Sequence, residues 1–597
     1  MNNKDFDILK LLLEMPYVSS DIISDLSGCS IAAVNRAVRR LTEGGFLDDS
    51  MQATAKGREL VNSSVPKNAV ILAAGTGSRM VPINTLYTKG MLEVNGETLV
   101  ERIILQLKSS GIKEIYVVAG YMKEEYERLE AQYGVQLIVN RDFRKRGSLY
   151  SLSLAKKHIS NTYIVPCDVW CRENPFSRHE MYSWYMVNEL VDDDSLVRVD
   201  RKKELQSVPA EKAGNGMVGL AYVSAEDAEK LVEKLSDEAL DAASTKARWE
   251  TALFSDEPLI RTARVVRSVD FVEIDTYEQL RELDEQSGQL RSYAIAIIMK
   301  ELGVKELDIT DIAVLKNGMT NRSFLFSCKG ERYIMRIPKE GTNRMINRRQ
   351  EALVYSLING RNICDELAYI NPDNGYKITK FIDHARTCDP NNIDEVHHCI
   401  EKLRWFHEQR LQVEQEFDIY RQIDFLQSLW QHEKSVYEDY RTTKNNIHCL
   451  KSFVDSQKKE LCLSHCDVMP DNFIIFNDEY GNEKIRIIDW EYAAMHDPHS
   501  DLAMFCVNGL YSREQIDELI DFYFRGSCDL PTRTKMYCYI AACGLMWSNW
   551  CEYKYDLGVE MGEYAAAQYR YAVEYYRIAS DNINMIEKGD NNVQGNE

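Results

Sequence analysis

The sequence predicts a multidomain protein of mixed α/β and α+β class, and three observations support this prediction. The chain has 597 residues, more than a single hydrophobic core usually organises. Its beginning shows only helical periodicity, whereas the stretch after "NSSVPKN" alternates strand and helix patterns, and another mixed pattern starts after Ser292. We therefore predict domains over residues 1–64, 65–290 and 291–585, followed by a disordered tail over residues 586–597.

Composition argues against several classes of protein. The formal charge is −21, which disfavours a general nucleic-acid coat because binding to phosphates needs clustered cations. No run approaches the roughly 18 apolar residues of a membrane span, so we expect no membrane insertion. The start "MNNKDFDILK" lacks a basic and apolar leader, which favours a cytoplasmic location. The 15 cysteines form no C-x-x-C pair and indicate reduced thiols rather than disulfides or a zinc site.

Residues 1–62 are predicted to form a compact helical unit with a short wing. "DFDILKLLLEM" is amphipathic, "SSDIISDLSGCS" predicts a short helix and a turn, and "SIAAVNRAVRRLTEGGFL" predicts a capped helix that ends at two glycines. This order resembles a winged helix-turn-helix, with Ser30–Thr42 as the recognition-type helix. Arg36, Arg39 and Arg40 lie on that helix and could contact DNA. Acidic residues slightly outnumber basic ones here, however, so packing on the next domain or dimerisation is favoured over DNA binding.

The second domain is predicted to be a doubly wound sheet with mostly parallel strands. Apolar segments such as "AVILAAG", "EIYVVAG" and "VQLIVN" alternate with helix patterns such as "TLVERIILQLKSSG". The first strand runs directly into small residues whose backbone N–H groups could close on a phosphate, and two cations follow within reach of a triphosphate. This segment contains the small residues Ala73, Ala74, Gly75 and Gly77 and the cations Arg79 and Lys89.

The stretch Ile71–Leu92 resembles the signature L-A-A-G-x-G-x-R of the nucleoside-triphosphate transferases, and it implies a nucleotidyltransferase domain. Thr88 stands before the lysine, where the family usually has proline, and Asn84 stands where threonine is common. Two later segments, "IVNRDFRKRGSLYSLSLA" and "YIVPCDVWCRENPF", bring the resemblance closest to the phosphocholine cytidylyltransferases. The matching family positions are Gly75, Gly77, Arg79, Pro82 and Lys89.

This resemblance implies roles for several residues of the second domain. Asp168, at the end of the strand "TYIVPCD", would bind magnesium. Pro166 replaces the other aspartate of the family's D-x-D pair, so Asp275 is the expected second ligand. Trp249 and Glu250 match an aromatic and acidic pair that faces the choline head, with a core tryptophan beside a surface glutamate as the alternative. The residues expected at the nucleotide are Ala73, Ala74, Gly75, Gly77, Arg79, Lys89, Asn140 and Ser148, of which Arg79 and Lys89 are also the expected catalytic cations.

The third domain carries a second phosphate-transfer pattern. "LSHCDVMPDN" has the spacing H-x-D-x-x-x-x-N, and Asp489 follows at the end of another apolar strand. This order is typical of protein kinases, so the predicted fold is a protein-kinase-like two-lobed domain. We expect Asp467 to accept the proton of a substrate hydroxyl, and Asn472 and Asp489 to hold Mg²⁺ on the ATP phosphates.

From about Ser292 to Tyr576 the chain resembles the choline kinase and aminoglycoside phosphotransferase superfamily. "GMTNRSF" matches the phosphate loop, and Arg336 stands where protein kinases carry a lysine, with Glu351 as its expected partner on a helix. A quaternary ammonium has no N–H to donate, so its recognition depends on aromatic faces and nearby carboxylates. The residues expected at the substrate's head are Glu491, Trp547 and Trp550.

Two further groups in this domain are expected to have no catalytic role. A basic run next to the phosphate loop is predicted to be a solvated helix face, and it comprises Lys339, Arg344, Arg348 and Arg349. A helix also carries adjacent residues of metal-ligating type that cannot converge on one ion, namely His397, His398 and Cys399.

The two phosphate sites predict one enzyme with two consecutive reactions and Mg²⁺ as its cofactor. The third domain would phosphorylate choline with ATP, and the second would couple phosphocholine to CTP, giving CDP-choline and pyrophosphate. Three alternatives stay open: ethanolamine or another amino alcohol as substrate, a sugar kinase joined to a sugar-nucleotide transferase, or a DNA-binding regulator with metabolite-sensing domains. The preference for cytosine rests on the resemblance alone, and the sequence carries no sign of the oligomeric state, of transfer between the sites or of the headgroup's final acceptor.

Overall fold

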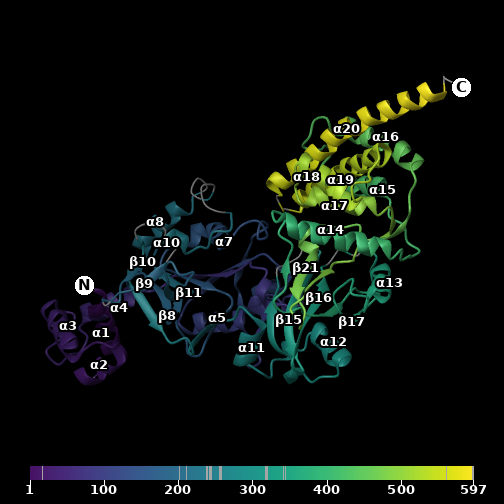
Figure 1. Cartoon of the computed structure of the whole chain (residues 1–597). Coiled ribbons are helices and arrows are strands. Elements are labelled where there is room, and N and C mark those ends of the chain that lie inside the picture. Colours follow the sequence, from purple (N-terminus) through teal and green to yellow (C-terminus); the bar gives the residue numbers. More distant parts are fainter. Residues whose placement is uncertain are drawn as a thin grey trace. The chain divides into compact units, whose positions relative to one another are not determined.

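The computed structural model divides the chain into two compact units, Met1–Ser292 and Tyr293–Glu597 (Figure 1). The structure describes residues 1–16, 18–200, 202–209, 212–236, 240, 245–254, 258–315, 320–339, 342, 345–557, 559 and 561–594. The predicted fold class is confirmed, because a mixed α/β sheet occupies the first unit and a sheet lobe with a helical lobe occupies the second. The finer division of the first unit near residue 64 stays a prediction.

The chain begins with four short helices, α1 (Asn3–Glu14), α2 (Ser20–Ser27), α3 (Ile31–Glu43) and α4 (Ala55–Ser63). A bridge between Leu47 and Ala53 forms the wing between α3 and α4. The hydroxyl of Ser30 caps α3 by accepting from the N–H of Ala33, as the sequence predicts. The apolar face of these helices encloses a small core of its own.

Two of the three arginines on α3 form ion pairs with acidic residues of this helical part. Arg40 donates to Asp5 at 2.6 Å, and Arg39 donates to Glu43 at 2.8 Å. The helices also rest on the sheet domain of the same unit, where the hydroxyl of Tyr182 donates to Asp7 at 2.6 Å. These contacts support the alternative in which the first domain packs on its neighbour.

A seven-stranded sheet forms the centre of the first unit, in the order β12-β8-β11-β6-β1-β4-β5. Strands β6, β1, β4 and β5 are parallel, whereas β11 is antiparallel to both β6 and β8. The strands are β1 (Asn68–Ala73), β4 (Glu114–Ala119), β5 (Gln136–Val139), β6 (Thr162–Pro166), β8 (Trp184–Asp192), β11 (Gly214–Val223) and β12 (Ala263–Val266).

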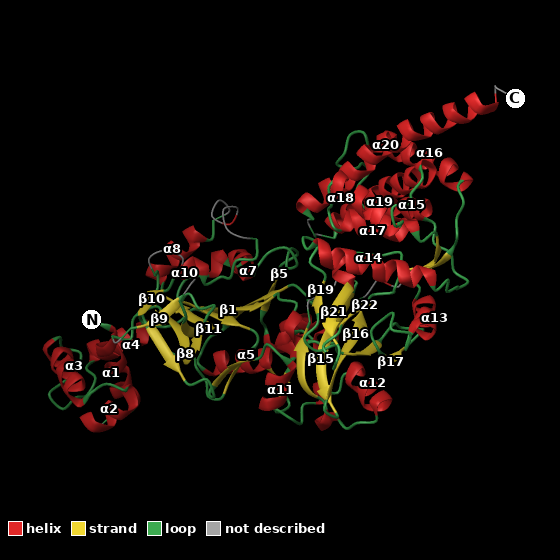
Figure 2. Ribbon diagram, in the orientation of Figure 1, coloured by secondary structure: helices red, strands yellow, loops and turns green. Residues whose placement is uncertain are grey.

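Helices cover both faces of this sheet. Ile71 of β1 packs into the core under α5 (Leu99–Ser109) and α6 (Glu124–Tyr133), while its neighbours Val70 and Leu72 point to the opposite core. That second core lies under α7 (Ser148–Leu154), α8 (Ala225–Lys234) and α10 (Thr251–Phe254). Figure 2 shows α5 on one side of the strands and α7, α8 and α10 on the other. The carboxyl ends of the parallel strands therefore lie at one edge of the sheet, where ligands bind in such folds.

The second unit starts with α12 (Tyr293–Leu302) and a five-stranded antiparallel sheet in the order β14-β15-β16-β18-β17. The helix α13 (Arg348–Ile358) follows β16 and is the helix expected to carry the partner of Arg336. The strands are β14 (Thr310–Val314), β15 (Asn321–Cys328), β16 (Glu331–Pro338), β17 (Leu367–Ile370) and β18 (Lys377–Lys380). The expected phosphate-loop segment "GMTNRSF" covers residues 318–324, of which residues 321–324 lie in β15, whereas residues 316–319 lie outside the described residues.

The remainder of this unit is a mostly helical lobe around one large core. Its strands are β19 (Arg386–Thr387), β20 (Cys462–Ser464), β21 (Phe473–Asn477), β22 (Glu483–Ile487) and β23 (Ala494–His496). Its helices are α14 (Ile393–Glu408), α15 (Ile419–Ser428), α16 (Tyr440–Ser456), α17 (His499–Asn508), α18 (Arg513–Tyr523), α19 (Leu530–Asp556) and α20 (Gly562–Gln594). α19 is buried on almost all sides, as expected of a helix with apolar residues around its whole circumference.

The tail expected to be disordered over residues 586–597 is helical up to residue 594. α20 continues as helix to Gln594, and residues 595–597 lie outside the described part. The last turns of α20 extend away from the rest of its unit, in yellow in Figure 1. Across the described chain, no helix combines the length and the hydropathy that crossing a membrane requires.

Candidate active sites

The first candidate site begins where β1 ends. Gly77 adopts the left-handed region with φ of 57°, and the side-chain amide of Asn84 donates to its carbonyl oxygen at 2.9 Å. A Cβ on Gly77 would lie only 3.0 Å from Cγ of Lys89. Glycine is therefore required here both by the backbone angle and by the packing of the lysine stem. Ala73 and Ala74 are buried, so the backbone of this loop, rather than its side chains, is what a phosphate would meet.

Lys89 lies among carboxylates gathered from distant segments. Its Nζ is 2.7 Å from Asp168 and also forms an ion pair with Asp275. Nη2 of Arg79 lies 2.7 Å from Oδ2 of Asp275, the carboxylate oxygen that does not contact Lys89 most closely. Burial by itself lowers the pKa of Lys89, but the two aspartates outweigh it and the pKa is raised, so the ammonium stays charged. Four of the predicted site residues therefore converge.

A third carboxylate, which the sequence reasoning missed, completes this cluster. Ligand oxygens of Asp168, Glu273 and Asp275 all lie within 4.8 Å of one another. The short strand β13 (Phe271–Glu273) pairs with β7 (Val169–Cys171), and this pairing sets Glu273 opposite Val169, next to Asp168. Burial and then its two acidic neighbours raise the pKa of Glu273 to about 8. Three oxygen donors at this spacing fit a hard divalent cation such as Mg²⁺.

Two further residues predicted at the nucleotide, Asn140 and Ser148, contact other parts of their own domain. Asn140 is buried and holds its own segment, since its side chain donates to Ser151 at 3.0 Å and accepts from the N–H of Asp142. The hydroxyl of Ser148 accepts from the N–H of Trp249 at 3.0 Å, which ties the expected nucleotide segment to the expected choline segment. The geometry thus assigns Asn140 and Ser148 contacts within the chain.

Trp249 and Glu250 are both buried, so the alternative of a surface glutamate is wrong. The Trp249 ring lies 6.0 Å from the ring of Tyr185, whose hydroxyl donates to Glu250 at 3.4 Å. Burial raises the pKa of Glu250 to about 7, and the nearby charge of Asp168 adds to this effect. A buried carboxylate beside aromatic rings provides an environment that stabilises a bound cationic head.

The second candidate site centres on the loop after β20. Asp501 of α17 is fully buried and accepts from the N–H of His465 at 2.7 Å and of Cys466 at 2.9 Å. His407 of α14 lies 3.0 Å from the same carboxylate. Cys466 has a φ of 61°, an unfavourable angle for a residue with a Cβ, and these hydrogen bonds hold it there. The sequence reasoning missed Asp501, which fixes the loop.

Asp467 projects from this fixed loop and is buried, with Oδ1 unpaired within the described part of the chain. The amide of Asn472 donates to the main-chain oxygen of Asp467 at 2.9 Å, which places both predicted residues together. Burial raises the pKa of Asp467, and the charges of Asp489 and Glu491 raise it further. An unpaired buried carboxylate is suited to accept a proton from a substrate hydroxyl.

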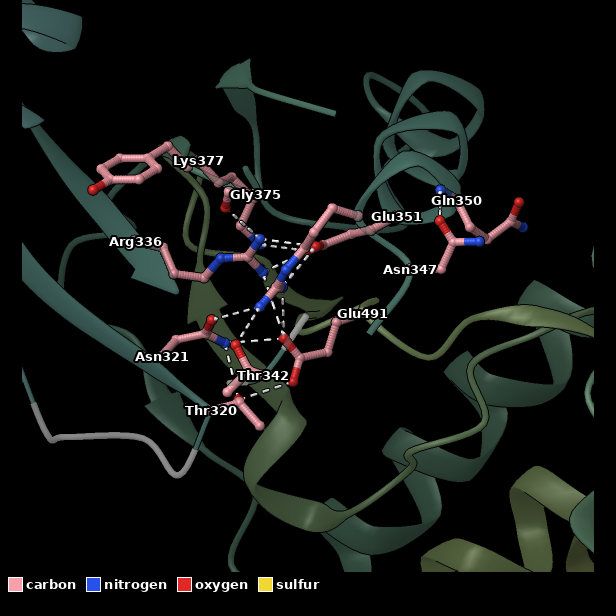
Figure 3. Close-up of polar contacts among 12 residues, drawn as sticks. Thr320, Asn321, Arg336, Thr342, Asn347, Gln350, Glu351, Gly375, Lys377 and Glu491 are labelled. Carbon is pink, nitrogen blue, oxygen red and sulfur yellow. Dashed lines mark hydrogen bonds and ion pairs between the residues drawn. The ribbon is translucent and has the colours of Figure 1, made fainter. Parts of the chain in front are cut away.

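The predicted pair of Arg336 and Glu351 is present. Nη1 and Nη2 of Arg336 donate to the two carboxylate oxygens of Glu351 at 2.5 and 2.8 Å, and Nη2 also donates to the carbonyl of Gly375 at 2.9 Å (Figure 3). Burial by itself raises the pKa of Glu351, but Arg336 lowers it to about 2. Lys377, opposite Arg336 on β18, has its Nζ 4.0 Å from Glu351 and is a further cation that the sequence reasoning missed.

Glu491 and Arg348 differ from expectation. Glu491 accepts from Thr320 and Asn321 at 2.9 Å each and from Arg348 at 3.3 Å, so both its oxygens face β15 and α13. The prediction that Arg348 lies on a solvated helix face is wrong, because only 3% of its side chain is exposed. Arg349 fits the prediction with 78% exposure, Lys339 is half-buried, and Arg344 lies outside the described residues.

Trp547 and Trp550 of α19 lie together with their rings 5.6 Å apart at an interplanar angle of 84°. Nε1 of Trp547 has no hydrogen-bond partner among the described residues. Lys554, one turn after Trp550, is only 7% exposed and places its ammonium 5.2 Å from the Trp550 ring centroid. Burial lowers the pKa of Lys554, and Glu491 is the charge that opposes this effect. A cation therefore already occupies one face of the predicted aromatic site.

The side chains of the three residues expected not to bind metal contact different parts of the chain. The ring of His397 stacks on Phe522 at 4.0 Å, His398 lies 3.1 Å from Glu483, and Cys399 belongs to the core. Within the described residues, the carboxylate cluster of the first unit is the group of His, Cys, Asp and Glu side chains whose spacing suits a metal ion. All cysteines are free thiols, as expected.

Three parts of the chain match models of known families. Residues 1–48 match the winged helix-turn-helix DNA-binding family, residues 69–203 match the MobA-like NTP transferase domain, and residues 312–525 match the choline/ethanolamine kinase family. These matches follow the order in which the three structural parts occur along the chain.

Individual relatives cover the two larger parts separately. A choline-phosphate cytidylyltransferase of Streptococcus pneumoniae is 29% identical over 222 residues, which is 36% of this chain and 96% of that protein. A 2-aminoethylphosphonate cytidylyltransferase of Lancefieldella rimae is 28% identical over 236 residues, 36% of this chain and 92% of that protein. Protein LicA of Haemophilus influenzae is 23% identical over 261 residues, 41% of this chain and 94% of that protein.

Proposed function

Because the chain joins an NTP transferase domain to a choline/ethanolamine kinase domain, we propose that it activates an amino alcohol in two consecutive steps. The kinase domain phosphorylates choline with ATP, and the transferase domain couples phosphocholine to CTP, releasing CDP-choline and pyrophosphate. The product of one site is thus the substrate of the other. Such an enzyme acts where ATP and CTP are available, so we place it in the cytoplasm.

The observation that carries the proposal is that the chain contains two candidate phosphate-transfer sites, each with charged side chains that lie together. In the transferase domain, Lys89 and Arg79 gather at the carboxylate cluster of Asp168, Glu273 and Asp275. In the kinase domain, the paired Arg336 and Glu351 accompany the unpaired carboxylate of Asp467. These two groups of charged side chains support the proposal of two phosphate-transfer reactions.

In the kinase step, Asp467 accepts the proton of the alcohol as its oxygen attacks the γ-phosphorus of ATP. Both prongs of the Arg336 guanidinium are held by Glu351, so Arg336 acts on the phosphates as a fixed positive charge. Trp547 and Trp550 bind the ammonium head through their faces. Mg²⁺, held by Asn472 and Asp489 when bound, neutralises charge on the phosphates.

In the transferase step, an oxygen of phosphocholine attacks the α-phosphorus of CTP and pyrophosphate leaves. Arg79 and Lys89 stabilise the negative charge that develops on the triphosphate. The buried Glu250, beside the ring of Trp249, stabilises the cationic head of phosphocholine. Mg²⁺, held by the cluster of Asp168, Glu273 and Asp275 when bound, withdraws charge from the triphosphate.

Separate assays of the two steps test this proposal. Release of ADP is followed with Mg²⁺, ATP and choline, and release of pyrophosphate is followed with Mg²⁺, CTP and phosphocholine. The proposal expects both signals from the purified full-length chain. Absence of ADP release with every amino alcohol tested, or of pyrophosphate release with every phosphorylated amino alcohol, would remove the corresponding half.

Ethanolamine is the second candidate substrate, since the matching family acts on choline or ethanolamine. A primary ammonium can also donate hydrogen bonds to a buried carboxylate such as Glu250, whereas a quaternary one cannot, which is a second reason to test it. The same assays with ethanolamine and phosphoethanolamine, compared through kcat/KM, decide which alcohol is preferred. For the first domain we propose packing on the transferase domain, and a gel-shift assay with DNA from the neighbourhood of its gene tests the DNA-binding alternative.

A further inference from the structure

Arg348 is the first residue of α13 and joins side chains from four separate segments. Its Nη1 donates to Glu351 at 3.2 Å and to Glu491 at 3.3 Å. Its Nη2 donates to Thr342 at 3.3 Å and to Asn321 of β15 at 3.5 Å. Its partners Asn321, Thr342, Glu351 and Glu491 are labelled in Figure 3, where they converge near Arg336.

Both glutamates that Arg348 contacts are buried. The side chains of Glu351 and Glu491 are 0% and 2% exposed, so water cannot solvate the charge of either carboxylate. Arg336 is bound to Glu351 and lies 3.8 Å from Glu491, too far for a hydrogen bond. Arg348 is therefore the cation in hydrogen-bond contact with both glutamates among the described residues.

The position of Glu491 in the chain gives this contact a consequence for catalysis. Glu491 comes two residues after Asp489, the predicted metal ligand, while Glu351 orients Arg336, the predicted phosphate clamp. Thr320 and Asn321, which donate to Glu491, belong to the predicted phosphate-loop segment "GMTNRSF". One guanidinium group thus connects the metal-binding segment of the helical lobe to the phosphate-binding side of the sheet lobe.

We propose that Arg348 is a positioning residue of the phosphoryl-transfer site, which holds Glu351 and Glu491 together and so sets the distance between the metal-binding segment and Arg336. The roles of Arg336 and Asp489 in this statement rest on the proposed function. Arg348 itself contacts neither ATP nor the alcohol. Its loss therefore acts on the binding and alignment of the nucleotide, and leaves the binding of the alcohol and the transferase step unchanged.

The test compares Arg348→Met with Arg349→Met in the full-length chain. Arg349 is the adjacent arginine on the same helix and is exposed, so its replacement controls for loss of a positive charge. We expect Arg348→Met to lower kcat/KM for ATP by about 100-fold, the size typical of breaking a buried charge pair, with the KM for choline unchanged. Arg348→Lys keeps the charge without the two-pronged geometry and should recover only part of this loss.

Three outcomes would overturn the proposal. One is equal kinetics for Arg348→Met and Arg349→Met. Another is a lower kcat with unchanged KM values and a smaller folded fraction, which indicates a purely structural role. The third is additivity with Glu491→Gln, since residues that act through one contact must give a double variant less impaired than the product of the two single effects.

Binding of Mg²⁺ and a non-hydrolysable ATP analogue, measured by calorimetry, separates this inference from the proposed function. The binding assay needs no alcohol, so it remains informative if neither choline nor ethanolamine is phosphorylated. We expect Arg348→Met to weaken nucleotide binding at least tenfold relative to Arg349→Met, and equal dissociation constants would contradict the inference. The transferase activity of the same chain reports whether the rest of the protein is intact.

Discussion

Replacement of Asp501 by asparagine should impair the kinase domain through the loop that carries Asp467. The carboxylate accepts from two backbone N–H groups and contacts His407, and both its oxygens are used. In Asp501→Asn, whichever oxygen becomes NH₂ faces a donor, so at least one buried N–H loses its acceptor. An unpaired buried donor costs about 1–3 kcal/mol, and a charge-assisted hydrogen bond contributes about 1.5–3 kcal/mol, so we expect a total loss near 3 kcal/mol.

A loss of this size should be visible as a shift in thermal inactivation. For a domain of a few hundred residues, 1 kcal/mol corresponds to about 2–4 °C, so kinase activity should be lost at a temperature about 6–12 °C lower. The kcat for the kinase step should also fall, because Cys466 is no longer held at its positive φ. Transferase activity, measured in the same samples, should be lost at the same temperature as in the unmodified chain.

The matched control is Asp521→Asn, the same substitution at a carboxylate that is 54% exposed and pairs with Arg533. Exposed ion pairs contribute about 0–1 kcal/mol, so this variant should behave like the unmodified chain. If Asp501→Asn and Asp521→Asn inactivate at the same temperature with the same kcat, Asp501 does not fix the catalytic loop and the reasoning fails.

Further predictions concern the two sites individually. Asp467→Ala should lower kinase activity by about 10²–10⁴-fold, the usual contribution of a general base, and spare the transferase, whereas Asp168→Ala should do the reverse; loss of both activities in either variant contradicts the two-site account. Glu273→Gln should raise the Mg²⁺ concentration for half-maximal pyrophosphate release by about tenfold, and an unchanged requirement would exclude it as a ligand. Lys554→Met should lower the KM for choline by about two- to fivefold as one face of Trp550 becomes free, and an unchanged or higher KM would show that the lysine does not compete there.

The parts of the account that the sequence predicted are those encoded in continuous stretches. The small residues after β1, the order of Asp467, Asn472 and Asp489, and the alternation of strands and helices can all be read from local spacing. Arg336 and Glu351 were predicted as a pair from the resemblance to kinases, in which a cation on a strand pairs with a glutamate on the following helix, and this pair is present.

The residues that the sequence reasoning missed act through contacts between distant segments. Glu273 reaches the carboxylate cluster only because β13 pairs with β7, and an isolated glutamate on a three-residue strand carries no signal of this. Arg348 and Arg349 are chemically identical neighbours, and only the packing of α13 decides that one is buried and the other exposed. Asp501 and Lys554 are likewise defined by what folds against them.

The central claim is that one chain carries out two consecutive reactions, and time-resolved phosphorus NMR tests it most directly. The purified protein is mixed with Mg²⁺, ATP, CTP and choline, and the phosphorus species are followed over time. The account predicts that a phosphocholine signal rises first and then falls as the diphosphate signals of CDP-choline and the pyrophosphate signal grow. Accumulation of phosphocholine without conversion, or absence of any new phosphorus signal with either choline or ethanolamine, would contradict it.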